Sequence, residues 1–149
     1  MTEAQATQVA NFWPALIGNY TKTLAQEILA ENYTDYSESA LSLNQVCPQV
    51  SGAAPPLTAP VFTSRQQFEE GQGSQPAIDS QVLNIWPACT TVTLRYNMTN
   101  LGTRPVITVV VIEAIEAPSS NKYPWIISDT FSEFDSEAWI QNLKDANKC

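Results

Sequence analysis

Residues 125–134 read Trp125-Ile126-Ile127-Ser128-Asp129-Thr130-Phe131-Ser132-Glu133-Phe134. In an extended strand, side chains point alternately to two faces with a period of two residues. One face of this stretch carries Trp125, Ile127, Asp129, Phe131 and Glu133. The other carries mostly Ile126, Ser128, Thr130 and Ser132. Because aromatic rings mixed with acids suit a pocket with polar groups better than a dry core, the stretch predicts a strand that lines a pocket.

The composition is that of a globular domain with an acidic surface. A chain of 149 residues fits a single domain, 1–149, and can bury one substantial core. It is 44% hydrophobic and 15% charged, which is typical of globular rather than disordered proteins. The net charge of −8 argues against nucleic acid, whose phosphates need a basic surface, and equally against anionic membranes. The longest apolar run, 106–112, has the length of a strand rather than the roughly 20 residues that span a bilayer.

Hydrophobic periodicity and end signals predict a helical start followed by strands. Helices are expected at 3–19, 21–31, 64–71 and 136–144, with Pro14 kinking or breaking the first. A short strand-like segment is expected at 33–37, and full strands at 81–88, 90–98, 105–115 and 123–134. The Pro-rich residues 44–60 predict a loop within the domain.

Two strands carry expectations about what covers the sheet. A glycan on Asn97 would require that residue to face solvent, which places Arg95 on the outer face and Tyr96 inward. The strand Val106–Ile112 is apolar on both faces, so it is expected to be covered on both sides. Helices supply one cover and a second subunit could supply the other, which makes a homodimer an expected arrangement.

Sequons and cysteines indicate an oxidising compartment. Three N-x-Thr sequons, at Asn19, Asn32 and Asn97, favour secretion. No signal peptide is visible, and the simplest account is a chain that begins at the mature protein with Met1 added. Of the three cysteines, Cys47 and Cys89 both flank expected strand or loop ends, so a Cys47–Cys89 disulfide is the preferred pairing. Cys149 is then left over. No CxxC or Cys/His pattern is present, so no metal site is expected.

Several short sequences together resemble a known family. They are Asp35-Tyr36-Ser37, Phe62-Thr63-Ser64-Arg65 leading into Phe68, Gly71-Gln72-Gly73-Ser74-Gln75-Pro76, Val82-Leu83-Asn84-Ile85-Trp86 with Cys89, Tyr123-Pro124-Trp125, and Ser132-Glu133-Phe134-Asp135-Ser136-Glu137-Ala138-Trp139. Over nearly the whole chain they resemble the small, secreted NTF2-like domain proteins of filamentous fungi.

The resemblance implies an α+β fold and a secreted protein. The fold is the NTF2-like cone, in which N-terminal helices pack on a strongly curved antiparallel sheet and a short helix closes the chain. Such proteins commonly carry a cysteine before the first helix, which would be a partner for Cys149. The family has no settled activity, so the resemblance supplies no catalytic residues.

The wider superfamily includes ketosteroid isomerase, scytalone dehydratase and SnoaL-type cyclases, which transfer protons without a cofactor. This chain has no histidine, which argues against a dehydratase of the scytalone type and excludes histidine-based catalytic triads. A carboxylate–tyrosine mechanism remains open, with Asp35 as base, Tyr20 as donor to an oxyanion, and Asp129 or Glu133 as acid. Each of these residues also has a structural interpretation, as a turn, core or helix-capping residue, and that interpretation is favoured over catalysis.

These observations lead to three alternative functions. The leading one is a secreted protein that binds a small hydrophobic molecule or a partner without catalysis, with no cofactor. The expected ligand-binding residues are Trp13, Tyr20, Asp35, Tyr96, Trp125, Phe131 and Glu133. The second is a cofactor-independent isomerase, lyase or cyclase. The third is a host-directed effector that acts through the surface of its sheet.

Overall fold

The structure is a computed structural model that describes residues 1–47 and 55–149. The helices are α1 (Glu3–Gly18), α2 (Lys22–Ile28), α3 (Glu38–Val46), α4 (Arg65–Gln72) and α5 (Ser136–Asp145). The strands are β1 (Leu29–Tyr36), β2 (Ser80–Ala88), β3 (Thr91–Met98), β4 (Val106–Glu116) and β5 (Trp125–Phe134). The fold is therefore of the α+β class that the sequence predicts.

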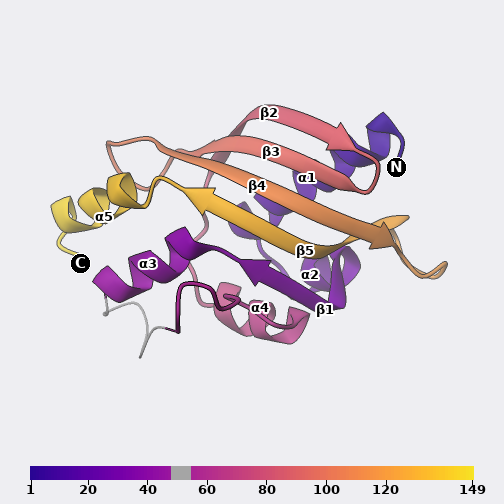
Figure 1. Cartoon of the computed structure of the whole chain (residues 1–149), viewed down its shortest axis with the longest axis horizontal. Coiled ribbons are helices and arrows are strands. Elements are labelled where there is room, and N and C mark those ends of the chain that lie inside the picture. The colour runs from indigo at the N-terminus through magenta and orange to yellow at the C-terminus, as the bar shows by residue number, and fades with distance from the viewer. Residues whose placement is uncertain (48–54) are drawn as a thin grey trace.

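The five strands form one curled sheet in the order β1-β5-β4-β3-β2. Neighbouring strands from β2 to β5 pair antiparallel, whereas β1 pairs parallel with β5. In the view of Figure 1, α1 and α2 lie behind the sheet, and α3 and α5 lie together beyond the end of β5. We call the sheet face toward α1 the inner face and the opposite face the outer face.

The first helix forms where its end signals predict. The Thr2 side chain accepts from the Gln5 backbone N–H, and the Gln5 side chain accepts from the Thr2 N–H, which completes a capping box. The apolar stripe of α1, which includes Val9, Trp13 and Leu16, is buried. The helix continues through Pro14 to Gly18, so the expected break at the proline does not occur.

The core lies between α1 and the inner face of the sheet. On β3 the side chains alternate as expected, with Val92, Leu94, Tyr96 and Met98 buried, and Arg95 on the outer face. Across residues 1–47 and 55–149, no helix combines the length and apolar character that crossing a membrane requires.

The segment after α2 departs from the predicted boundaries. The helix expected at 21–31 ends at Ile28, because the following residues pair with β5 as β1. An unpredicted helix, α3, follows β1, with the Ser37 side chain accepting from the Ala40 N–H as its N-cap. This helix occupies the start of the loop expected at 44–60, and residues 48–54 of that loop lie outside the described residues.

A bulge at Ser128 overturns the predicted face pattern of β5. Glu113 of β4 pairs with Asp129 and the next residue, Ala114, pairs with Ile127, so Ser128 is the extra residue. The alternation therefore shifts by one position. Trp125 and Ile127 pack on the helix side, whereas Phe131 and Glu133 lie exposed on the outer face with Asp129 half-buried beside them. The expected single wall of Trp125, Ile127, Asp129, Phe131 and Glu133 does not exist.

The predicted Cys47–Cys89 disulfide is wrong. The structure joins Cys47, the C-cap of α3, to Cys149, with 5.1 Å between their Cα atoms. Cys89 is free and exposed at the turn between β2 and β3. The pairing follows from the packing of α3 against α5, which brings the end of α3 beside the C-terminal residues. Cys149 therefore needs no partner before residue 1.

Replacing Gly102 with alanine is expected to lower the free energy of unfolding by about 2 kcal/mol. Gly102 has a φ of +141°, and a Cβ there would lie 2.5 Å from Cγ of Asn142. Asn142 is buried in α5 and both donates to and accepts from the backbone of Arg104, so its displacement would break two hydrogen bonds. Urea denaturation measures the change. The neighbouring exposed Thr103→Ala serves as control, and equal stability of the two variants would contradict the account.

Candidate functional site

Three polar side chains form a buried hydrogen-bonded chain on the inner face of the sheet. Asp35 of β1 pairs in register with Thr130 of β5, and the Thr130 hydroxyl donates to the Asp35 carboxylate at 2.6 Å. The Tyr33 hydroxyl lies 2.5 Å from the same Thr130 oxygen. Because Thr130 gives its one proton to Asp35, Tyr33 is the donor in this second bond. Tyr33 and Thr130 are fully buried, and Asp35 is 5% exposed.

The buried position of Asp35 places its titration near neutral pH. Burial raises its pKa from 3.8 to about 6, the charge of Glu133 adds to the rise, and the hydrogen bond from Thr130 opposes it. Burial also raises the pKa of Tyr33, and the Asp35 charge adds to that rise. A carboxyl group with a pKa near 6 can accept a proton from a ligand or donate a hydrogen bond to it within the physiological range.

A second polar group on the inner face lies across β3 and β4. Trp13 of α1 donates its ring N–H to the Tyr96 hydroxyl at 2.9 Å. Thr108 pairs with Tyr96 in register and is 1% exposed, yet its hydroxyl has no hydrogen-bond partner among the described residues. Burial raises the pKa of Tyr96, and the hydrogen bond from Trp13, together with the neighbouring Thr108 hydroxyl, offsets part of that rise. The inner face therefore contains an unused polar group beside a tyrosine.

Phe68 of α4 closes the interior next to these groups. Its side chain is 1% exposed. Its ring makes edge contacts with Tyr33, at 5.6 Å between centroids, and with Phe62, at 5.4 Å. The rings of Trp13 and Tyr20 lie 6.4 and 6.3 Å away. Phe68 thus contacts Tyr33, which hydrogen-bonds to Thr130 beside Asp35. It also contacts Trp13, which donates to Tyr96.

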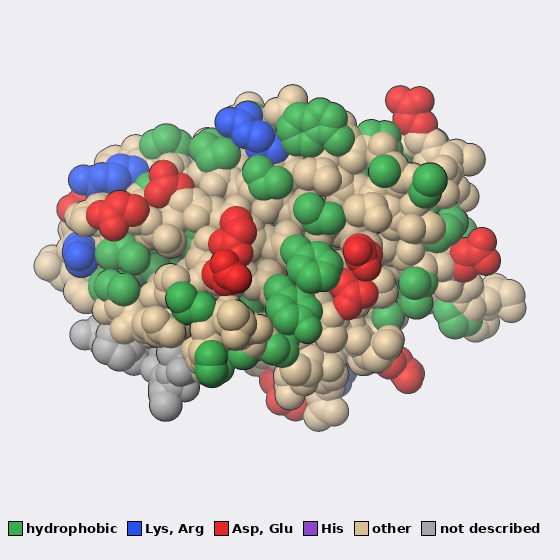
Figure 2. Space-filling view, viewed as in Figure 1, with side chains coloured by type: hydrophobic (Ala, Val, Ile, Leu, Met, Phe, Trp, Pro, Cys, Tyr) green, Lys and Arg blue, Asp and Glu red, His purple; other side chains and the backbone are tan. Residues whose placement is uncertain are grey.

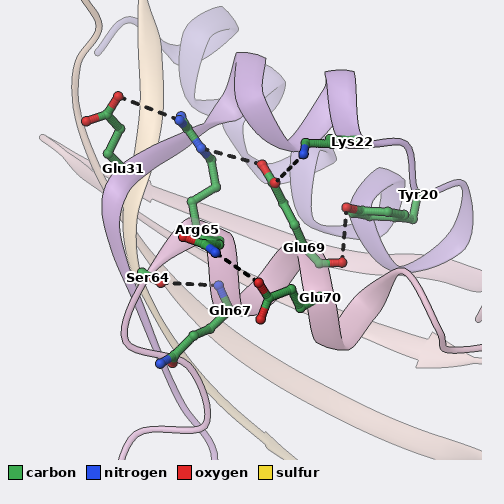
Figure 3. Close-up of polar contacts among 9 residues, drawn as sticks. Tyr20, Lys22, Glu31, Ser64, Arg65, Gln67, Glu69 and Glu70 are labelled. Carbon is green, nitrogen blue, oxygen red and sulfur yellow. Dashed lines mark hydrogen bonds and ion pairs between the residues drawn. The ribbon is translucent and has the colours of Figure 1, made fainter.

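Surface polar contacts hold α4 in this position (Figure 3). Glu69 forms ion pairs with Lys22 at 3.6 Å and with Arg65 at 3.7 Å, and Arg65 also reaches Glu31 at 3.7 Å. The Tyr20 hydroxyl donates to the Glu69 carbonyl oxygen at 3.3 Å. Only Lys22 and Glu31 are exposed in these ion pairs, whereas the Arg65 and Glu69 side chains are largely buried, so polar contacts and the packing of Phe68 together attach α4.

The other carboxylates proposed for catalysis lie elsewhere. The Glu133 carboxylate accepts from the backbone N–H groups of Glu38 and Ser39 at 2.9 and 3.0 Å, and from the Ser39 hydroxyl, so it caps α3. Asp129 accepts from the Thr34 hydroxyl. Tyr20 bonds to α4, as described above. Asp35, Tyr20 and Glu133 therefore do not converge on one site.

The residues expected to bind a ligand divide among three places. Trp13, Asp35 and Tyr96 lie in the interior, and Tyr20 lies at its edge against Phe68. Phe131 and Glu133 line a groove of about 400 Å³ on the outer face, together with Tyr36, Ser37, Glu38, Leu57, Thr58, Val109 and Val111. Trp125 lines a polar hollow of about 600 Å³ near the start of β5. Neither hollow includes Asp35 or Tyr96.

The described residues offer no metal site. Within 1–47 and 55–149, no three Cys, Asp or Glu side chains gather in a way that could hold an ion.

A family model for NTF2-like domains matches residues 1–146. The chain belongs to the NTF2-like family. The match covers every element from α1 to α5, so the buried carboxylate and its neighbours lie inside an NTF2-like cone. No curated protein matches this NTF2-like chain.

Solved structures share the fold of this NTF2-like chain. A protein from Kribbella flavida DSM 17836 has a TM-score of 0.62 at 13% identity, covering 99% of this chain and 100% of its own. A second K. flavida protein, provisionally assigned as a ketosteroid isomerase, has a TM-score of 0.59 at 16% identity. The match covers 89% of this chain and 78% of that protein. An LEH-like epoxide hydrolase from M. tuberculosis has a TM-score of 0.59 at 9% identity. The match covers 95% of this chain and 91% of that protein. At these identities the likeness concerns the fold alone.

Several interior residues were not among the sequence-based candidates. Tyr33 could have been found, because it lies two residues before Asp35 and so shares its face in a strand. Thr130 is on the face opposite Phe131, as the alternation of β5 predicts, and the register between β1 and β5 makes it a partner of Asp35. Thr108 and Phe68 carried no local signal, since their positions depend on the register of β4 and on the packing of α4.

The free energy of unfolding is expected to fall as pH rises through the titration of Asp35. Its pKa is about 6 in the folded chain and ordinarily 3.8, so between these values the folded state binds the proton more firmly. The stabilisation is complete below pH 3.8 and lost above about pH 6, on the order of 3 kcal/mol. Urea denaturation from about pH 4 to pH 8 should show a shallower decline for Asp35→Asn than for the wild type. If the free energy of unfolding falls equally with pH in the wild type and in Asp35→Asn, Asp35 is not a buried titrating carboxyl.

Proposed function

We propose that this chain binds a small, flat hydrophobic molecule carrying one hydroxyl or carbonyl group in the interior of its cone. The polar group of the ligand meets Asp35 or the Thr108 hydroxyl, and its apolar body takes the place of Phe68 against Tyr33 and Trp13. The observation that carries the proposal is a buried carboxyl with a pKa near 6 on the same inner face as a buried hydroxyl without a partner.

Energetics support a ligand at this place rather than a purely structural role. A buried polar group without a hydrogen bond costs about 1–3 kcal/mol, and a buried carboxylate costs more. Thr108 and Asp35 both lie where an apolar residue would pack at no such cost. Violations of this kind are expected at functional sites, where stability is given up for binding or chemistry. A ligand hydroxyl can donate to the Asp35 carboxylate or accept from the Thr108 hydroxyl, and a carbonyl oxygen can accept from Thr108.

Access to the interior requires Phe68 to move. The structure has the interior closed, since Tyr33, Phe68 and Tyr96 are at most 1% exposed. The helix α4 has only 8 residues, and the partners of its ion pairs on α2 and β1, Lys22 and Glu31, are exposed side chains. Displacing Phe68 into solvent costs about 1.5–3 kcal/mol, which a ligand that buries a comparable apolar area can offset. The proposal therefore places the entrance under α4.

Two matched probes test the binding. The first is 2-naphthol, and the second is 2-methylnaphthalene, which has the same shape without the hydroxyl. Above pH 6, we expect 2-naphthol to bind roughly tenfold more tightly than 2-methylnaphthalene, because its hydroxyl donates to the charged Asp35 carboxylate. Asp35→Asn should remove most of this preference, measured by fluorescence titration. Equal affinities for the two probes in the wild type would count against the proposal.

A matched variant controls for the loss of charge. Asp129→Asn removes a carboxylate from the neighbouring strand, outside the interior. It should leave the preference for 2-naphthol unchanged. If Asp129→Asn and Asp35→Asn have the same effect, the probe binds outside the interior.

A second candidate function is a cofactor-free proton transfer, which the pKa of Asp35 specifically favours. In this reaction the Asp35 carboxylate takes a proton from a carbon next to a carbonyl group, which leaves an enolate, and returns it to the same carbon or to the far end of a conjugated double bond. α-Deuterated 2-tetralone is a suitable probe, because exchange appears as loss of deuterium. Catalysed exchange should rise through about pH 6 and fall at least 100-fold in Asp35→Asn. Binding without exchange would leave only the first function.

Secretion and glycosylation form part of the proposal. The Cys47–Cys149 disulfide fits an oxidising compartment. Asn19 and Asn32 are exposed, whereas Asn97 is half-buried. Expression through a eukaryotic secretory pathway should therefore add glycans at Asn19 and Asn32, seen as mass lost on treatment with an endoglycosidase. A secreted chain without any glycan would contradict this part.

A further inference from the structure

The outer face of the sheet carries a row of residues that crosses every strand and is apolar or aromatic on all of them except β3. The register places Trp86, Thr93, Val111, Phe131 and Tyr36 side by side on β2, β3, β4, β5 and β1. We call these five residues the outer row. Trp86 is 51% exposed and Phe131 is 42% exposed, and the Phe131 ring stacks on Tyr36 at 5.4 Å with 9° between the planes. Large aromatic surfaces are thus presented to solvent on a rigid sheet.

A groove deepens one end of the outer row. It has a volume of about 400 Å³ and lies between the Tyr36–Phe131 stack, Val109 and Leu57. Val109 and Leu57 are 39% and 41% exposed. The groove can receive a bulky apolar side chain from outside, because its own residues leave this surface uncovered.

Acidic side chains surround the outer row. On one side of the outer row, the neighbouring cross-strand row of the same face ends with Glu133 on β5. On the other side, the neighbouring row contains Glu113 of β4 and Asp129 of β5. Glu38 joins Glu133 at the groove. Arg95 is the only basic residue on the three rows. Figure 2 shows the resulting pattern, with hydrophobic side chains across the middle of this face and acidic groups on either side of them.

From this arrangement we infer that the outer row is a docking surface for a basic, apolar segment of another protein. The segment inserts Leu, Phe or Trp side chains against Tyr36, Phe131 and Trp86. Its Lys or Arg side chains lie along Glu38, Glu113 and Asp129. Charge complementarity selects this partner, since the surface bears several carboxylates and the whole chain carries −8.

A second copy of the chain fits this surface less well. Packing two outer faces together would bring two sets of the same carboxylates into one interface, with a single arginine from each copy to neutralise them. Like charges juxtaposed at an interface disfavour association. A partner with the opposite charge meets no such penalty.

Synthetic peptides test the inference on the full chain. The probe is a fluorescein-labelled peptide of alternating lysine and leucine with one central tryptophan, and its match has glutamate at every lysine position. We expect the basic peptide to bind and the acidic peptide not to bind. Binding should weaken at least tenfold in Phe131→Ser, and roughly fivefold in the double variant Glu38→Gln/Glu113→Gln. Raising the salt concentration should reduce the effect of the double variant.

Control variants separate this surface from general charge attraction. Glu3→Gln/Glu70→Gln removes two exposed acids from α1 and α4, and should leave the affinity for the basic peptide unchanged. Equal weakening by the two double variants, or undiminished binding by Phe131→Ser, would overturn the inference. Sedimentation of the protein alone gives a further check. A dimer that Phe131→Ser dissociates would assign the surface to a second copy and also overturn it.

Discussion

Breaking the Cys47–Cys149 disulfide is expected to lower the free energy of unfolding by about 4 kcal/mol. The two residues are 102 apart in sequence, so the bond closes a loop that spans most of the chain. A cross-link over a loop of about 100 residues restricts the unfolded chain by roughly 4.7 kcal/mol at 25 °C, and measured losses for native disulfides are typically about 2–5 kcal/mol. Urea denaturation of Cys149→Ser against the wild type measures the loss.

The free cysteine provides the control for this prediction. Cys89→Ser changes an exposed side chain and should alter the free energy of unfolding by less than about 0.5 kcal/mol. Peptide mapping without reductant should recover a fragment that joins the Cys47 and Cys149 segments. Strong destabilisation by Cys89→Ser together with a mapped bond to Cys89 would contradict the observed pairing.

Replacing Phe68 with alanine is expected to cost about 3–5 kcal/mol while strengthening the binding of 2-naphthol. The ring is 1% exposed and contacts four aromatic neighbours, so its removal leaves a cavity that the surrounding rings cannot fill. The same cavity adjoins Tyr33 and therefore the Asp35 chain. A ligand that normally has to displace Phe68 no longer does so in this variant, and its affinity should rise.

Opposite signs for stability and affinity make this prediction specific. Phe68→Leu keeps most of the buried volume and should lie between the wild type and Phe68→Ala in both measurements. Phe131→Ala removes an exposed phenyl ring on the outer face. It should change the free energy of unfolding and the affinity for 2-naphthol only slightly. Weaker binding of 2-naphthol by Phe68→Ala would mean that the phenyl ring is part of the binding wall rather than its cover.

Local sequence signals predicted most of the elements because those elements depend on local interactions. The capping box at Thr2, the N-cap at Ser64 and the alternation of β3 each involve residues a few positions apart. The helix α3 has a local N-cap at Ser37, which was not among the predicted helix starts, and its N-terminus is also stabilised by Glu133, nearly a hundred positions away. No pattern around residue 38 indicates that contact.

Long-range pairing explains two of the wrong predictions, the face pattern of β5 and the disulfide. The bulge at Ser128 arises in the register between β5 and β4, and a strict alternation through that residue assigns Phe131 and Glu133 to the wrong face. The disulfide depends on α3 and α5 packing side by side, which the spacing of the cysteines does not reveal. In both cases the deciding contact lies between segments far apart in the chain.

The candidate site was predictable only in part. Asp35 and Tyr96 were expected on ligand-facing or inward positions, and both lie in the interior. Tyr20 and Glu133 were expected to work with Asp35, but each is engaged by a helix, α4 and α3 respectively. The groups that replace them, Thr130 and Thr108, belong to ordinary strand sequence. Only the assembled sheet places them next to a buried acid and a tyrosine.

A crystal structure of the protein with 2-naphthol is the most direct test of a ligand site in the interior. The account predicts that the naphthyl ring lies between Tyr33 and Trp13, with Phe68 displaced and the hydroxyl within hydrogen-bonding distance of Asp35 or Thr108. Naphthol bound only in the outer groove, with Phe68 still packed on Tyr33, would contradict it.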